Sequence, residues 1–477
     1  MSSHRPLLPR STPAGAGISS RAISALLDRL EAESIECHSL MVVRRGHVVA
    51  EGWWAPYSAD RPHLLYSLTK SFTSTAVGLA ITDGLLSLDD RVVDVLPEHV
   101  PEDVAEQGRR ITVHHLLSMT TGRRTDSLAE AWQLESGDLT KGFLRVPFTD
   151  PEGSRHLYED ATTYLLARMV ERVTGRDLPG FLDERLFHPM GIDHAEWDRV
   201  ASGAAFGFHG LHLTTEAVAA FGELLLRGGV WGDRQLVPRE WVELATRKHI
   251  DTTEPLPNWL PNPDFLSGYG YQFWRSRHGY FGNGAYGQLC VVAPAHDLVV
   301  VMTSALERTD VVPGAFWDCL LPGLDQVGSA EDDEALADRL RRLTLAPVIG
   351  AAAPNRSSKA RVDGSPADSA LPDGTTVTVD PVDGGWQVQL GSSLAVAVGH
   401  GDWRESTPLG RPVVATGAWQ DGKFVAELYV ITSPHRARLV VDADAGTAQA
   451  TWSTVPLTTS SLELHLRSPL MTRPDVA

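Results

Sequence analysis

Lysine is scarce in this 477-residue chain, and arginine supplies nearly all of its positive charge. Five of the 42 basic residues are lysines, namely Lys70, Lys141, Lys248, Lys359 and Lys423. The 60 acidic residues outnumber the basic ones and give a net charge of -18. Because such a surface repels a phosphate backbone, we expect no nucleic-acid partner. Where arginine is the default cation, a remaining lysine is of interest, since lysine can lose its proton and arginine cannot.

Long apolar runs and metal-binding cysteine motifs are also missing. No stretch approaches the ~20 apolar residues needed to cross a bilayer, and residues 1–18 lack the apolar segment of a secretory signal. Cys37, Cys290 and Cys319 match no metal spacing, and we expect buried free thiols. His114 and His115 are adjacent and point apart on a helix, so they cannot share an ion. We therefore expect a cytoplasmic protein with no membrane association, no structural disulfide and no metal or other cofactor.

The chain is long enough for two or three domains of ~150 residues, and its 43% of hydrophobic residues can form a sizeable core. An amphipathic helix over 19–34 and a hairpin near 40–49 precede a mostly helical stretch over 88–225. Strand-like segments return at 289–303, and hairpin connections make the sheet antiparallel. We predict an α/β domain over 19–347 with an antiparallel sheet and a helical subdomain. A linker over 348–374 and an all-β sandwich or barrel over 375–470 follow.

Ser67 and Lys70 lie three residues apart at the start of a helical pattern over 68–83 that Gly84 ends. They therefore share a helix face, at an N-terminus whose N–H groups favour developing negative charge. A serine hydroxyl is a poor nucleophile until a base removes its proton. A desolvated lysine with a lowered pKa can be that base. The alternative is that Ser67 only caps the helix and Lys70 is a solvated residue of the first turn.

Four segments around this pair carry a family resemblance. They are 66–70 (YSLTK), 75–80 (TAVGLA), 83–90 (DGLLSLDD) and 112–122 (TVHHLLSMTTG). They resemble the serine β-lactamase and penicillin-binding-protein superfamily, in its class C-like branch of esterases, amidases and peptidases. The resemblance covers roughly residues 35–325. It implies an acyl-serine mechanism and an antiparallel sheet with a helical subdomain.

The resemblance also assigns two residues in front of a predicted helix near 161. Tyr158 matches the tyrosine of the family's Tyr-x-Asn loop, which implies that it is the second proton-transfer residue. Asp160 stands in place of the asparagine, at a substrate-binding position. A carboxylate cannot donate an amide N–H to a substrate carbonyl, so we expect Asp160 to cap the helix. Its charge would also repel a substrate carboxylate.

The stretch 281–288 (FGNGAYGQ) takes the place of the family's Lys-Thr-Gly or His-x-Gly strand, and it contains no cation. The anchor for a β-lactam carboxylate is therefore missing, which argues against β-lactam hydrolysis as the main role. By resemblance, the backbone N–H groups of Ser67 and Ala285 form the oxyanion hole. We expect Asn283 to hydrogen-bond a neutral substrate, with Gly284 and Tyr286 beside it, and the glycines to let the backbone approach that substrate.

These observations predict a serine hydrolase that cleaves an ester or amide of a small molecule or peptide. Ser67 is the predicted nucleophile, with Lys70 and Tyr158 moving protons and water accepting the acyl group. The motifs equally fit an acyltransferase or peptide cyclase, in which an amine or alcohol accepts it. A third interpretation is a non-catalytic sensor that is acylated without turnover, which Asp160 and the missing cation favour.

Overall fold

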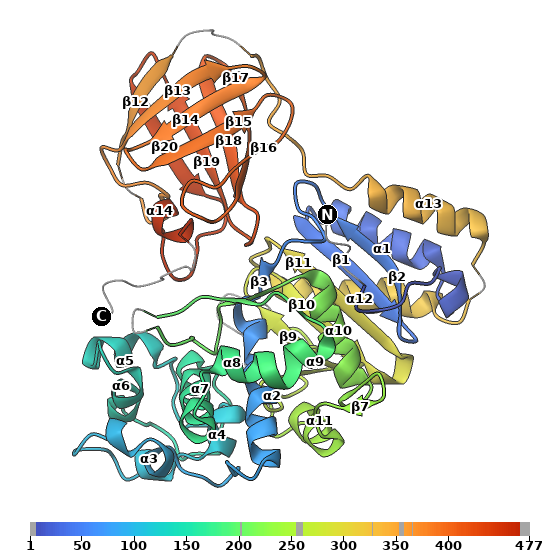
Figure 1. The fold of residues 1–477 in the computed structure, drawn as a ribbon, viewed down its shortest axis with the longest axis vertical. Coiled ribbons are helices and arrows are strands. Elements are labelled where there is room, and N and C mark those ends of the chain that lie inside the picture. The colour runs from blue at the N-terminus through green and yellow to red at the C-terminus, as the bar shows by residue number, and fades with distance from the viewer. Residues whose placement is uncertain are drawn as a thin grey trace.

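The computed structural model describes residues 6–200, 203–253, 261–326, 328–352, 357–364 and 366–467. Its N-terminal α/β domain contains a six-stranded sheet of order β2-β1-β11-β10-β9-β8 (Figure 1). Every neighbouring pair in this sheet is antiparallel, as predicted. The strands are β1 Cys37–Arg44, β2 His47–Trp53, β8 Trp274–Ser276, β9 Gly279–Gly284, β10 Gln288–Ala293 and β11 Leu298–Ser304.

Both faces of this sheet are buried, because apolar residues occupy both alternating sets of strand positions. In β1, Leu40 and Val42 face one core, whereas Met41 and Val43 face the other. The first face is covered by α1 Ser20–Ala32 and α12 Val312–Leu320, and α13 Ala330–Arg341 packs against α1 and β2. The second face is covered by α2 Thr69–Thr82 and α10 Thr215–Leu226, with α11 Arg239–Thr246 beside them (Figure 1).

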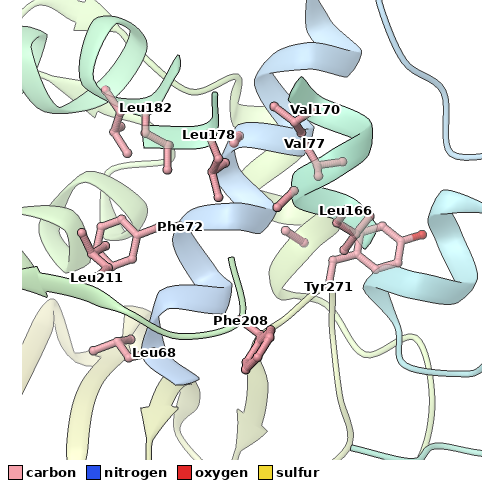
Figure 2. Close-up of a cluster of buried hydrophobic side chains, with 14 of the residues drawn as sticks. Leu68, Phe72, Val77, Leu166, Val170, Leu178, Leu182, Phe208, Leu211 and Tyr271 are labelled. Carbon is pink, nitrogen blue, oxygen red and sulfur yellow. The ribbon is translucent and has the colours of Figure 1, made fainter. Parts of the chain in front are cut away.

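Helix α2 is the central element of the domain, and it is buried on nearly all sides. Val77 lies beside Leu166 and Val170 of the helical subdomain, whereas Phe72 lies on the other side of α2, beside Leu211 (Figure 2). This subdomain contains α3 Val92–Val95, α4 Val113–Leu117, α5 Leu128–Leu134, α6 Leu139–Arg145, α7 Asp160–Thr174, α8 Leu178–Leu182 and α9 His188–Met190. The sheet and the subdomain therefore meet at the helix that begins beside Ser67.

Two small sheets complete the α/β domain. One has the order β3-β5-β4, with β3 His63–Leu64, β4 Glu196–Trp197 and β5 Leu211–Leu213. The other pairs β6 Val230–Trp231 with β7 Arg234–Gln235. Strand β3 ends directly before the segment that carries Ser67, so the first small sheet helps to fix the position of that segment.

The C-terminal domain is a β-barrel with its own hydrophobic core. Its strands are β12 Ser358–Val362, β13 Thr376–Val382, β14 Gly385–Leu390, β15 Leu394–Gly399, β16 Arg404–Ser406, β17 Val413–Gln420, β18 Lys423–Val430, β19 Arg436–Asp442 and β20 Thr447–Trp452, followed by α14 Leu462–His465. A pairing between β15 and β17 closes the ring, and β16 lies along β17. The predicted β-rich domain is confirmed as a barrel.

One boundary differs from the prediction. The first barrel strand, β12 Ser358–Val362, lies inside the predicted linker of 348–374. Its side chains alternate between buried and exposed, and it pairs with β13 and β20. The strand is short and stands between Pro-, Ser- and Gly-rich segments, so the composition of the region hides its alternation.

Candidate active site

Ser67 lies in a single turn of 3₁₀-helix, Tyr66–Leu68, that leads directly into α2. Tyr66 has a φ of 48°, a left-handed conformation that a bulky side chain rarely adopts. The Tyr66 hydroxyl lies 2.5 Å from Nε2 of His435 in the barrel, and this contact holds the ring in place. A strained residue that is fixed by tertiary contacts commonly marks a functional site. In this chain the strained residue, Tyr66, directly precedes the predicted nucleophile, Ser67.

Lys70 lies one turn into the helical region and faces Ser67, as the spacing predicts. Its Nζ is 2.7 Å from Ser67 Oγ and 3.0 Å from the carbonyl oxygen of Phe208. The residue is only 1% exposed, so the ammonium group is held away from solvent. The alternative in which Lys70 is a solvated first-turn residue is therefore wrong.

Asp160 makes the third contact of this ammonium group, which the sequence did not predict. Its Oδ1 lies 2.7 Å from Lys70 Nζ. Asp160 is the first residue of α7, and the N-cap position belongs to Glu159 instead. Glu159 is fully buried and forms an ion pair with Arg123 at 3.2 Å. The expectation that Asp160 caps the helix is wrong, because this neighbouring pair fixes Glu159 and leaves Asp160 to face Lys70.

The Asp160 carboxylate reverses the expected direction of the Lys70 pKa. Burial alone lowers the pKa of a lysine, because a low-dielectric surrounding disfavours its charged form. Attraction to Asp160 and interaction with Tyr158 more than offset this effect, so the pKa of Lys70 is raised above its usual value. The predicted lowering is wrong. Lys70 is protonated at neutral pH and forms an ion pair.

We expect Asp160→Asn to lower the pKa of Lys70. The substitution removes the main group that raises this pKa and leaves the effect of burial, so the Lys70 signal should titrate at lower pH than in the wild type. NMR of ¹³C-labelled lysine side chains measures this directly, and five lysines keep the spectrum simple. The exposed Lys248, which pairs with Asp251, serves as the control signal that the substitution leaves unchanged. An unchanged Lys70 titration would refute the assignment.

Tyr158 lies directly before α7 and faces the same pair of residues. Its hydroxyl interacts with Ser67 and Lys70, and Lys70 Nζ lies 4.8 Å from the centre of its ring. The ring stacks on Trp274 at a centroid distance of 5.5 Å and an interplanar angle of 13°. Burial raises the pKa of Tyr158, and the attraction to Lys70 offsets this only in part. Tyr158 is therefore a neutral phenol at neutral pH, with a proton to donate.

Glycines allow β9 to approach the Ser67 segment. A Cβ atom at Gly282 would lie 2.3 Å from Leu68 Cδ1, and one at Gly284 would lie 2.0 Å from the carbonyl oxygen of Leu65. A side chain at Gly284 would clash with the backbone of this segment, and one at Gly282 would force the Leu68 side chain to move. The close approach is thus to the protein's own chain, to a side chain at Gly282 and to the backbone at Gly284, whereas the sequence predicted an approach to substrate. Gly284 places Ala285 next to this segment, and the role of the Ala285 N–H stays a prediction.

Two predicted substrate contacts, one on β9 and one just after it, have other surroundings than expected. Asn283 lies on the opposite face of β9 from Gly282 and Gly284, the face on which Phe281 packs against the α1 side of the sheet. The hydroxyl of Tyr286 donates to the carbonyl oxygen of Val455 in the barrel. Neither orientation follows from the local sequence, and the substrate contacts of Asn283 and Tyr286 stay predictions.

A cavity of about 70 Å³ opens beside Ser67. Its lining residues are Tyr66, Ser67, Leu128, Trp132, Asp160, Phe206, Phe208, His209, Leu457 and Thr458. Sequence reasoning did not select the aromatic residues from α5 and 206–208, nor the two from the barrel. The walls are largely apolar, and no arginine or lysine is among the described residues that line them. The described lining therefore offers no cation to hold an anionic group.

His209 is a further polar residue of this cavity that sequence reasoning missed. It is 5% exposed, and neither of its ring nitrogens has a hydrogen-bond partner among the described residues. Burial lowers the pKa of His209 to about 4, so the ring is neutral at physiological pH. It can accept or donate one hydrogen bond to a neutral ligand.

The part of the chain that the structure describes contains no helix long and apolar enough to cross a bilayer. Within the same residues, no group of three or more His, Cys, Asp or Glu side chains is arranged to hold a metal ion. Cys37 and Cys290 are buried and free, as predicted, and Cys319 is free and partly buried.

Comparison with known proteins agrees with this geometry. The beta-lactamase family model matches residues 23–316, more than half of the chain. The chain belongs to the beta-lactamase family. It is 26% identical over 329 residues to the 6-aminohexanoate-dimer hydrolase of Paenarthrobacter ureafaciens, covering 63% of this chain and 81% of that protein. It is 34% identical over 133 residues to penicillin-binding protein 4 of Amycolatopsis lactamdurans, covering 26% of this chain and 33% of that protein.

A solved structure supports the same fold for this beta-lactamase-family hydrolase. EstCE1, described as a hydrolase with promiscuous acyltransferase activity, superposes with a TM-score of 0.51 at 17% identity. The superposition covers 63% of this chain and 97% of EstCE1. The family match ends at residue 316, before the barrel begins, so the family does not account for the barrel.

Proposed function

We propose that this beta-lactamase-family enzyme hydrolyses small neutral esters or amides through an acyl intermediate on Ser67. The observation that carries the proposal is the chain of polar contacts Ser67–Lys70–Asp160. Both distances in this chain are 2.7 Å, and Tyr158 lies beside its first two members. Such an arrangement connects a nucleophile, a proton carrier and a proton acceptor.

Acylation begins when Ser67 Oγ attacks the carbonyl carbon of the substrate. A protonated lysine cannot accept a second proton, so Lys70 passes one of its own to Asp160 as it takes the proton of Ser67. Asp160 is thus the net acceptor and acts through Lys70. The negative charge that develops on the carbonyl oxygen is stabilised by the backbone N–H groups of Ser67 and Ala285.

Collapse of the tetrahedral intermediate breaks the bond to the leaving group. Tyr158 protonates the departing alcohol or amine and is reprotonated by Lys70, which recovers its proton from Asp160. The three groups thereby return to their starting charges. Water then repeats the sequence on the acyl-enzyme, with the carboxylic acid and free Ser67 as products.

The preference for neutral substrates rests on charge. The cation that the resemblance places on strand β9 is absent from 281–288, and Lys70 is already paired with Asp160. A substrate carboxylate near Asp160 would meet repulsion of ~1 kcal/mol or more, because two like charges approach at close range. Neutral esters and amides avoid this cost, whereas penicillins and cephalosporins do not.

A short pulse of p-nitrophenyl butanoate followed by acid quench tests the proposal. Mass spectrometry of the digested protein should locate the butanoyl group on Ser67, and the Ser67→Ala protein should carry none. An adduct on another residue, with Ser67→Ala fully active, would refute the proposal.

The same assay with an added amine distinguishes hydrolysis from acyl transfer by the product formed. A stable Ser67 adduct without turnover would identify an acylation sensor instead.

A further inference from the structure

The barrel domain supplies part of the wall of the Ser67 cavity. Leu457 and Thr458 lie in the loop 453–461, between β20 and α14, and line the cavity with Ser67. Leu457 is 61% exposed, although most large apolar side chains of the described chain are buried. An exposed leucine at the mouth of an apolar cavity is placed to contact a ligand.

Hydrogen bonds hold this loop in a defined position. His435 Nδ1 donates to the carbonyl oxygen of Thr454 at 2.8 Å, and Trp452 Nε1 donates to that of Ser460 at 2.7 Å. The carbonyl oxygen of Val455 accepts from Tyr286, which follows β9. The loop is therefore fastened both to the barrel and to the strand beside Ser67.

The same loop also contacts the residue next to the nucleophile. Because Nδ1 of His435 donates to a carbonyl oxygen, its Nε2 accepts the Tyr66 hydroxyl proton at 2.5 Å. The Tyr66 oxygen also interacts with the backbone of Leu457. The position of Leu457 is thus linked through one side chain to the strained residue that precedes Ser67.

The barrel as a whole is bound firmly to the α/β domain. The buried Arg411 pairs with the buried Asp198 at 2.8 Å. The Leu64 N–H of β3 donates to the carbonyl oxygen of Thr432 at 2.8 Å, three residues before Ser67. Breaking a buried ion pair of this kind leaves an uncompensated charge, so the interface resists separation.

We infer that the barrel is part of the active site and that loop 453–461, through Leu457, limits the acyl group of the substrate to a short apolar chain. The inference rests on the proposed function and names its substrate class, a small-molecule ester or amide with a short uncharged acyl group. The cavity of about 70 Å³ is well below the ~300–1,000 Å³ of sites for drug-sized ligands. A cavity of this volume, with Leu457 and Ser67 in its wall, matches a short acyl group rather than a long or bulky one.

The test compares p-nitrophenyl acetate, butanoate and octanoate on purified full-length protein. Leu457→Ala should raise the ratio of kcat/KM for octanoate over butanoate by ~10-fold or more, the range that one or more methylenes produce in an apolar pocket. Leu457→Trp should fill the cavity and lower the butanoate-to-acetate ratio. Val382→Ala is the matched control, an exposed apolar side chain of the same barrel outside the cavity lining, and should leave both ratios unchanged.

A binding measurement separates this inference from the proposed reaction. Saturation-transfer NMR on the Ser67→Ala protein should detect butanamide but not octanamide, and the added Leu457→Ala change should admit octanamide. This result supports the inference even if the wild type hydrolyses no ester, an outcome that would refute the proposed reaction alone. Ester hydrolysis with chain-length ratios that both folded Leu457 variants leave unchanged would overturn the inference.

Discussion

Replacing Lys70 by arginine is expected to reduce ester turnover by ~10³-fold or more, as much as replacing it by alanine. The Lys70 ammonium group is 1% exposed and contacts Ser67 and Asp160 at 2.7 Å each. A guanidinium keeps the positive charge and can still pair with Asp160. It cannot give up a proton at working pH, however, and it is wider than the space that holds an ammonium group. The Lys70→Arg substitution therefore removes the ability to transfer a proton while it keeps the positive charge.

Hydrolysis of p-nitrophenyl butanoate from mildly acidic to alkaline pH provides the measurement, and circular dichroism confirms folding. Lys248→Arg is the matched control, because Lys248 is exposed and its ion pair with Asp251 tolerates either cation. It should retain wild-type activity. A folded Lys70→Arg protein that keeps a tenth or more of the wild-type rate would show that Lys70 carries no proton in the reaction.

Tyr158→Phe is expected to lower kcat by ~10²–10⁴-fold with little change in KM or fold. The substitution removes the hydroxyl that interacts with Ser67 and Lys70, and it preserves the ring that stacks on Trp274. Loss of a proton donor affects the chemical step, whereas loss of a packing group affects stability. Tyr269→Phe is the matched control, a buried tyrosine on the same tryptophan. Equal kcat values for Tyr158→Phe and the wild type would assign Tyr158 to packing.

Local patterns predicted the parts of the site that lie close together in the chain. Ser67 and Lys70 share a face because three residues make nearly one helical turn, and this holds for any helix that begins there. The hairpin around Arg45 and Gly46 follows in the same way from its apolar strands and from a turn of two residues with positive φ. Tyr158 was selected through the family resemblance, which carries tertiary information that its local sequence lacks.

Long-range packing set the position of Asp160 and the pKa of Lys70, two features that local sequence patterns predicted wrongly. Asp160 is ninety positions from Lys70 in the chain, and it reaches the ammonium group only because α7 packs against α2. The local pattern predicted that Asp160 caps the helix, but the buried ion pair of Arg123 and Glu159 sets the start of α7. The pKa direction of Lys70 was misjudged for the same reason, since burial was anticipated and its carboxylate partner was not.

By itself, the sequence determined the elements of the fold and the Ser67–Lys70 pair, because hydrophobic periodicity and helix spacing act over a few residues. Only the tertiary structure decided the charge state of Lys70 and the contribution of the barrel to the cavity. Leu457 is nearly four hundred residues after Ser67 in the chain. It lies near Ser67 because strand pairing closes the barrel and interdomain hydrogen bonds fix the position of the barrel. Electrostatic interactions and cavity walls depend on distance in space, and no local pattern encodes that distance.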